Sequence, residues 1–244
     1  MDDLLDHEFL EEYATFGAYN HKLIADILFE AMSSASEDAI KILSVKIYAE
    51  FISAIEDFAG LCIALRDRDK MSILGSYMFF GTKFKGRKII GPGQFFREAI
   101  RVDGEPDKLF HFPTLEGLEK KASLDEQKGY ESTYTFLKET ILMAASWYRI
   151  ENRMAIGTYN KTKHGFVVTR GFNKASPFFD SKGSEAAVLY SEPSTAKDGQ
   201  LVINGSLIDS EIGIKEELSG INRLMDATIN LIELYLDLRD KKLA

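Results

Sequence analysis

Apolar and polar positions alternate at helical spacing through the first quarter of the chain. This pattern predicts helices over residues 4–16 and 23–32, because apolar side chains recur there every three or four positions. A longer helix is predicted to begin after Ser36, which can cap the free N–H groups, with Glu37 and Asp38 in the first turn, where they favour the helix dipole. Its apolar stripe is wide enough for burial on more than one side and consists of Ile40, Leu43, Ile47, Phe51, Ile55, Phe58 and Cys62.

The pattern is interrupted between residues 75 and 113, where glycines and prolines are frequent. Such residues indicate turns, so we predict a loop-rich excursion with one short helix over residues 93–100. A basic run with neighbouring aromatic side chains, Lys83–Lys88, lies inside this excursion. It could form a nucleic-acid or phosphate-binding loop, but it lacks the spacing of a P-loop. A solvated loop or hairpin tip is the interpretation that we favour.

A second helical block is predicted from Thr114. Ser123 and Glu126 have the spacing of a capping box, and the helix that follows is expected to run from residue 124 to about His164. Its core stripe is predicted to consist of Met143, Trp147, Ile150 and Met154.

Short β-prone runs follow Gly165, at residues 166–170, 186–190 and 200–203. They predict a small antiparallel sheet, inserted over residues 166–204. A final helix over residues 210–241 is expected to close the bundle. The predicted fold is therefore mainly α: one domain, residues 1–244, a helical bundle of five or more helices with a small antiparallel β insertion.

Composition and charge limit the possible functions. Hydrophobic residues make up 45% of the chain and charged residues 28%, which is typical of a globular protein with a core. The formal net charge of −8 disfavours tight non-specific DNA binding and membrane association by charge, so nucleic acid would have to bind a local patch. No apolar run approaches the ~20 residues that span a bilayer. The acidic start of the chain and its single cysteine, Cys62, favour the cytoplasm, with Cys62 as a small buried hydrophobe.

Motifs for metals and cofactors are lacking in the sequence. It has no dinucleotide fingerprint, no Gly-x-Ser-x-Gly and no Glu-x-x-His pair, and three of the four histidines, at positions 7, 21 and 111, are isolated. Glu50 and Glu56 are six positions apart, which does not place them on one helix face. We therefore expect no metal and no cofactor, and a nucleotide hydrolase with metal-bound carboxylates is the least favoured hypothesis.

One segment, residues 159–165 (YNKTKHG), combines groups that can do chemistry. Asn160 and His164 are one helical turn apart, Arg153 falls in the same angular band, and Gly165 is well placed to end the helix. This band is expected beside the predicted core stripe, where a polar group can line a cleft.

In such a cleft His164 could move a proton near neutral pH, and Asn160 could orient the imidazole or the substrate. Arg153, Lys161 or Lys163 could stabilise charge on a phosphate, and Tyr159 is a further substrate-binding candidate. This combination suits metal-independent cleavage of RNA, in which the 2′-hydroxyl is the nucleophile. The structural alternative is that the lysines complement the helix dipole, the histidine caps carbonyls and the asparagine packs at a bend.

The Asn160-x-x-x-His164 spacing near the end of a long helix resembles the HEPN superfamily, whose members are often RNases or RNA-binding and toxin-associated proteins. The family motif is arginine, a polar residue, three variable residues and histidine. Asn160 and His164 match its last two fixed positions, whereas Tyr159 stands in place of the arginine. The resemblance implies a HEPN-like protein that binds or cleaves RNA, and the missing arginine implies weakened catalysis or binding alone. A second hypothesis is a non-enzymatic helical protein that works by association, for example as a homodimer.

Overall fold

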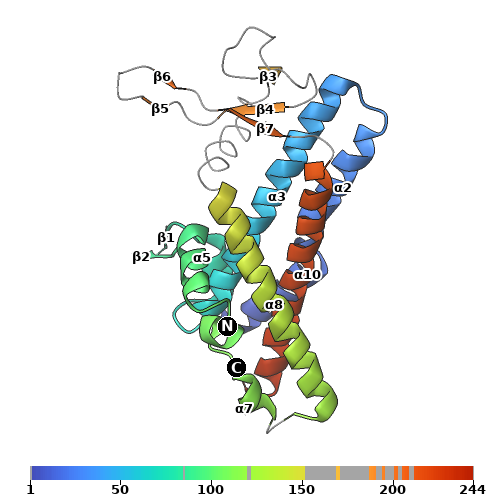
Figure 1. Cartoon of the computed structure of the whole chain (residues 1–244). Helices are drawn as coiled ribbons and strands as arrows, with labels where there is room; N and C mark the ends of the chain where they lie inside the picture. Colours follow the sequence, from blue (N-terminus) through green and yellow to red (C-terminus); the bar gives the residue numbers. More distant parts are fainter. Residues whose placement is uncertain are drawn as a thin grey trace. The chain divides into compact units, whose positions relative to one another are not determined.

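The computed structural model describes residues 2–84, 86–119, 122–151 and 212–243, together with short strand segments between residues 169 and 208. The described part is mainly helical, as the sequence predicts (Figure 1). The long helices are α1 (Asp2–Thr15), α2 (Asn20–Met32), α3 (Glu37–Arg66), α8 (Leu124–Glu151) and α10 (Ile212–Asp240). Shorter ones are η1 (Gly17–Tyr19), α4 (Ile73–Met78), α5 (Pro92–Arg101), α6 (Pro106–Phe110) and α7 (Leu115–Glu119).

Two local predictions about helix starts are confirmed. The Ser36 hydroxyl accepts a hydrogen bond from the backbone N–H of Ala39, at 3.4 Å, directly before α3. The Ser123 hydroxyl accepts the N–H of Glu126, and the Glu126 carboxylate accepts the N–H of Ser123 at 2.8 Å, which is the reciprocal pattern of a capping box. Both starts are set by residues within one helical turn, so the sequence alone could specify them.

The loop-rich excursion contains a hairpin. Strands β1 (Lys83–Phe84) and β2 (Arg87–Lys88) pair antiparallel, and Gly86 has a φ of 80°, which a turn of this kind requires. The prediction of a hairpin at the basic run is therefore confirmed, and the alternative that this run binds nucleic acid or phosphate stays a prediction. Helix α5 begins at Pro92, one residue from the start predicted for the short helix.

Further short strands occur in the region predicted to be a β insertion. They are β3 (Thr169–Arg170), β4 (Ala187–Tyr190), β5 (Ser194–Thr195), β6 (Leu201–Val202) and β7 (Gly205–Ile208), with antiparallel pairing β3–β4–β7 and β5–β6. The other residues of 166–204 lie outside the described part of the chain. The predicted insertion therefore stays a prediction.

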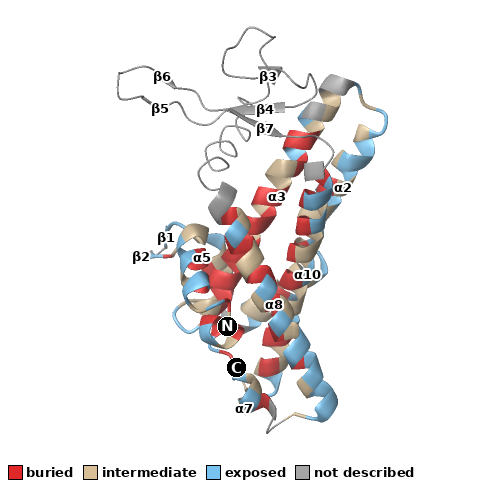
Figure 2. Cartoon of the chain, viewed as in Figure 1, coloured by how far each residue is buried: buried red, intermediate tan, exposed pale blue. Residues whose placement is uncertain are grey.

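The chain divides into two compact units, each described by itself. Unit 1 comprises residues 1–20, 54–148 and 222–244. Its core combines the second half of α3 with α5, α6, α8 and α10, and Figure 2 shows buried residues along these helices. Cys62 is fully buried there, and burial raises the pKa of its thiol, so the prediction of a small buried hydrophobe is confirmed.

The buried face of α8 differs from the prediction. Met143 and Trp147, the described members of the predicted stripe, are only half-buried. The buried row instead includes Leu137, Ile141 and Ala144, which are fully buried. Ile150 is described only as part of the helix, and Met154 lies outside the described residues. The predicted core stripe is therefore wrong for Met143 and Trp147, and for Ile150 and Met154 it stays a prediction.

The described residues of unit 2 are 21–53, 149–151 and 212–221, together with strands β3–β7. Phe51 of α3 packs so closely on Gly220 of α10 that a Cβ at position 220 would lie 2.5 Å from its ring. Helix α2 has a different character, because Ala25 is its one fully buried residue. Among all the helices that the structure describes, none has an apolar stretch of the length and character needed to cross a membrane.

Candidate functional site

The predicted catalytic residues Arg153, Asn160 and His164 lie outside the described residues, as do the predicted substrate-binding residues Tyr159, Lys161 and Lys163. They fall between Glu151, at which the described part of α8 ends, and Ile212, at which α10 begins. The expectation that Arg153, Asn160 and His164 lie beside the core is based on a predicted core row that includes Met143 and Trp147. These two residues are not on the buried face of α8. The site therefore stays a prediction that rests on sequence.

Two of the other histidines are engaged in side-chain contacts. His21 Nδ1 lies 2.9 Å from Glu50 Oε2 within unit 2. In unit 1, Arg239 donates to His7 Nδ1 at 2.9 Å, so α1 and α10 are joined near the two ends of the chain. Among the described residues no group of three His, Cys, Asp or Glu side chains is arranged to hold a metal ion.

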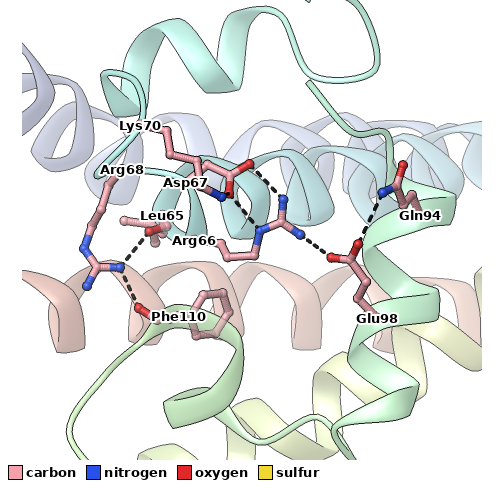
Figure 3. A network of polar contacts seen from close by, with 8 residues as sticks. All are labelled: Leu65, Arg66, Asp67, Arg68, Lys70, Gln94, Glu98 and Phe110. Atoms are coloured by element: carbon pink, nitrogen blue, oxygen red, sulfur yellow. Dashed lines mark hydrogen bonds and ion pairs between the residues drawn. The ribbon is translucent and has the colours of Figure 1, made fainter. Parts of the chain in front are cut away.

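An ion-pair network surrounds the end of α3 (Figure 3). Arg66 donates to the Asp67 carboxylate at 2.8 Å and to Glu98 of α5 at 2.5 Å. Burial alone would raise the pKa of Asp67, but hydrogen bonds and charge from Arg66 and Lys70 hold it below its usual value. Every charge in this network has an opposite charge beside it, so its role is to fix α5 on α3.

Arg68 makes a second set of contacts next to this network. Its Nη1 donates to the backbone oxygens of Leu65, at 2.8 Å, and of Phe110, at 2.6 Å (Figure 3). Its guanidinium carbon also lies 5.5 Å from the centres of the Phe112 and Tyr235 rings, within the range of cation–π attraction. Arg68 thus joins α3, α6 and α10 in a structural role.

A cavity of about 370 Å³ lies between α8 and α10 of unit 1. On its wall, Lys241 contacts Glu126 at 2.8 Å and Asp237 at 3.0 Å, and Tyr130 donates to Asp237 at 2.5 Å. Hydrogen bonds from Lys241 and Ser123 lower the pKa of Glu126 to about 2. These charges are matched within the wall, and the arrangement provides no nucleophile with an adjacent base.

Two surface features become visible only in the structure, although the sequence already indicated the basic run of the hairpin. One is an apolar face on α2, where Leu23 is 50% and Ile27 is 65% exposed. The other is a set of exposed cations, Lys83 and Lys88 on the hairpin and Arg97 and Arg101 on α5. A hydrophobic pattern predicts which helix face is apolar, but whether a second element covers that face depends on the fold.

Comparison with known proteins adds no relative. No family model matches the chain, and neither the curated proteins nor the solved structures include a significant match.

Proposed function

We propose that this chain is a HEPN-like helical protein that acts on RNA through the segment Tyr159–His164. The observation that carries the proposal is the Asn160-x-x-x-His164 spacing, with two lysines between its fixed residues. The mainly helical fold supports it, as does α8, which is helical from Leu124 to Glu151 and leads toward the segment. Because the net charge of the chain is −8, RNA would have to be held at a local basic patch.

The proposed chemistry is attack of the RNA 2′-oxygen on the neighbouring phosphorus. His164 takes the 2′-hydroxyl proton, the P–O5′ bond breaks, and the same proton passes from the imidazole to the leaving 5′-oxygen. The products are a 2′,3′-cyclic phosphate and a 5′-hydroxyl end. Asn160 orients the imidazole, and Arg153, Lys161 and Lys163 stabilise the charge that develops on the phosphate. Because the nucleophile belongs to the substrate, this route needs no metal ion.

Tyr159 determines how much activity is expected. The family motif has arginine at this position, so one cation beside the phosphate is missing. A neighbouring cation that stabilises a transition state contributes roughly two to three orders of magnitude in rate. We therefore propose slow cleavage or binding without turnover, with Tyr159 contacting a base or sugar.

The first test is incubation of the purified protein with labelled RNA, with and without EDTA. Cleavage that survives EDTA and leaves cyclic phosphate ends is the expected result. His164→Ala should reduce the rate by about 10²–10⁴-fold, the usual contribution of a positioned acid–base group. His111→Asn is the matched control, because His111 is an exposed histidine with a φ of 55°, which asparagine tolerates.

If His164→Ala binds and cleaves RNA as well as the unmodified chain does, the proposed role of the segment is wrong. Binding without cleavage would support the binding-only form of the proposal, provided that Lys161→Gln with Lys163→Gln weakens it. Release of phosphate from nucleotides that EDTA abolishes would favour a metal-dependent hydrolase instead.

A second candidate function, association of two copies, is favoured by the apolar face of α2. This face combines Leu23, Ile24 and Ile27, at 50%, 36% and 65% exposure. Ile27 is four positions after Leu23 and three after Ile24, so it shares a helix face with each of them. Lys22 stands near the beginning of α2 and Glu30 near its end, so an antiparallel second copy would bring opposite charges together.

Introducing charge into this face should therefore separate a dimer. Leu23→Glu with Ile27→Glu is expected to give a monomer by light scattering at concentrations where the unmodified chain is a dimer. The control is Leu124→Glu, which changes a leucine of 75% exposure on α8 and should leave the mass unchanged. A monomeric unmodified chain at high micromolar concentration would exclude this function.

A further inference from the structure

The segment from the hairpin through α5 has a charge opposite to that of the whole chain. Residues 83–101 contain six lysines and arginines and one glutamate, a formal net charge of +5 in a chain of net charge −8. The described side chains of Lys83, Lys88, Arg97 and Arg101 are all exposed. We call these four residues the cationic surface.

The hairpin places like charges opposite each other. In the β1–β2 register, Lys83 and Lys88 are direct partners across the two strands. Like charges in this position repel and destabilise a strand pair. A hairpin with strands of two residues is also marginally stable without further support. The facing lysines therefore destabilise the hairpin. An anion bound between them would neutralise their repulsion.

The hairpin leads directly into α5, which carries the other two cations. The hairpin continues through hydrogen bonds between Ile89 and Thr82 and between Gly81 and Ile90, and it ends at Gly91, the N-cap of α5. Arg97 Nε donates to the oxygen of Gly93 at 3.2 Å, so its guanidinium lies over the first turn of the helix. Arg101 is four residues later, on the same face.

The one carboxylate of the segment does not neutralise these cations. Glu98 accepts hydrogen bonds from Arg66 and from Gln94, as Figure 3 shows. Within the part of the chain that the structure describes, no member of the cationic surface forms an ion pair. Other cations do have carboxylate partners within 4 Å: Lys22, Arg66, Lys70, Lys138, Arg223, Arg239 and Lys241.

We propose that the cationic surface binds the phosphate backbone of single-stranded RNA. This inference rests on the proposed function and names a second contact for the same substrate. Lysine and arginine neutralise phosphates without reading the bases, so this surface would provide affinity and leave selectivity to other residues. A single strand can follow a local patch, whereas a flat anionic membrane would also approach the acidic remainder of the protein. At physiological salt, exposed charges more than about 8 Å apart are largely screened from each other. The acidic remainder of the chain therefore weakens the attraction between RNA and this patch only a little.

The test compares the binding of fluorescent oligouridylate by variants in which the cations become glutamine. The main variant replaces Lys83, Lys88, Arg97 and Arg101 together. The control is Lys108→Gln with Lys128→Gln, which removes two exposed cations of the same unit. The dissociation constant of the main variant should rise about tenfold or more at low salt. The slope of log K against log salt should fall by about 0.7 for each phosphate that the variant no longer neutralises.

The thermal unfolding midpoint of the main variant should stay the same or rise, because the repulsion between Lys83 and Lys88 is removed. An unchanged dissociation constant and salt slope in this variant would overturn the inference and leave the role of His164 intact. If the main variant loses binding and His164→Ala changes neither binding nor cleavage of RNA, the role of His164 is overturned and the inference about the cationic surface stands. No RNA binding by the unmodified chain would overturn both proposals. Equal binding of oligoglutamate or of anionic vesicles through the same four residues would overturn the assignment to RNA.

Discussion

Replacing Arg68 with alanine is expected to lower the free energy of unfolding by about 2–4 kcal/mol. The guanidinium donates to the oxygens of Leu65 and Phe110, and both of these residues are fully buried. Without it, two carbonyl groups lose a charged donor in a place where water has little access, and the Phe112 and Tyr235 rings lose a cation. The measurement is urea unfolding followed by circular dichroism at constant pH.

Two further variants show whether geometry or charge is responsible. Arg68→Lys keeps the charge, but a single ammonium group has no planar fork to hold between two rings, so we expect an intermediate decrease in stability. Arg101→Ala removes an exposed arginine of the same unit and should change stability by less than about 0.5 kcal/mol. If Arg68→Ala unfolds at the same urea concentration as Arg101→Ala, the contacts of Arg68 do not stabilise the fold.

Arg68 also shows where prediction from sequence ends. The run Arg66-Asp67-Arg68-Asp69-Lys70 has the composition of a solvated helix end. Its arginines nevertheless reach residues 32 and 42 positions away, Glu98 and Phe110. Such contacts depend on how α5 and α6 return to α3, which no local pattern encodes. The caps at Ser36 and Ser123 are predictable for the opposite reason, because each involves residues within one turn.

The wrong core stripe on α8 has a similar cause. The largest apolar side chains, Met143 and Trp147, suggest the buried row, but close packing of helices favours small residues such as Ala144 and Ala145, which are buried. Polar side chains also enter the buried face when their polar atoms have partners. Tyr134 does so, because its hydroxyl donates to the oxygen of Pro113 at 2.7 Å.

For the candidate site, the sequence specifies residue types and their spacing but not their surroundings. The spacing of Asn160 and His164 indicates a shared helix face, but the direction of that face depends on the neighbouring elements. The expectation that this face borders the core depends on Met143 and Trp147 being core residues. Both are only half-buried, and the buried row of α8 lies elsewhere. The chemistry therefore depends on residue types and spacing, which is why the RNA assay comes first.

Two glycine-to-alanine substitutions should change stability in opposite directions. Both Gly220 and Gly129 lie inside helices, where alanine is favoured over glycine by about 0.8–1 kcal/mol. At position 129 a Cβ would meet no atom within 4 Å, so Gly129→Ala is expected to stabilise the protein by about this amount. At position 220 the Cβ would lie 2.5 Å from Cε2 of Phe51, a buried ring with 6% exposure. Overpacking of this kind costs about 1–3 kcal/mol, so Gly220→Ala should destabilise unit 2.

A double-mutant cycle with Phe51→Leu isolates the contact, because leucine removes the ring that the new methyl group would meet. In the Phe51→Leu background the cost of Gly220→Ala should fall by at least about 1 kcal/mol, whereas Gly129→Ala should have the same effect in both backgrounds. Chemical unfolding of all six chains provides the comparison. A stabilising Gly220→Ala in the unmodified background would mean that α3 and α10 are not in contact at these positions, since the propensity gain would then be unopposed.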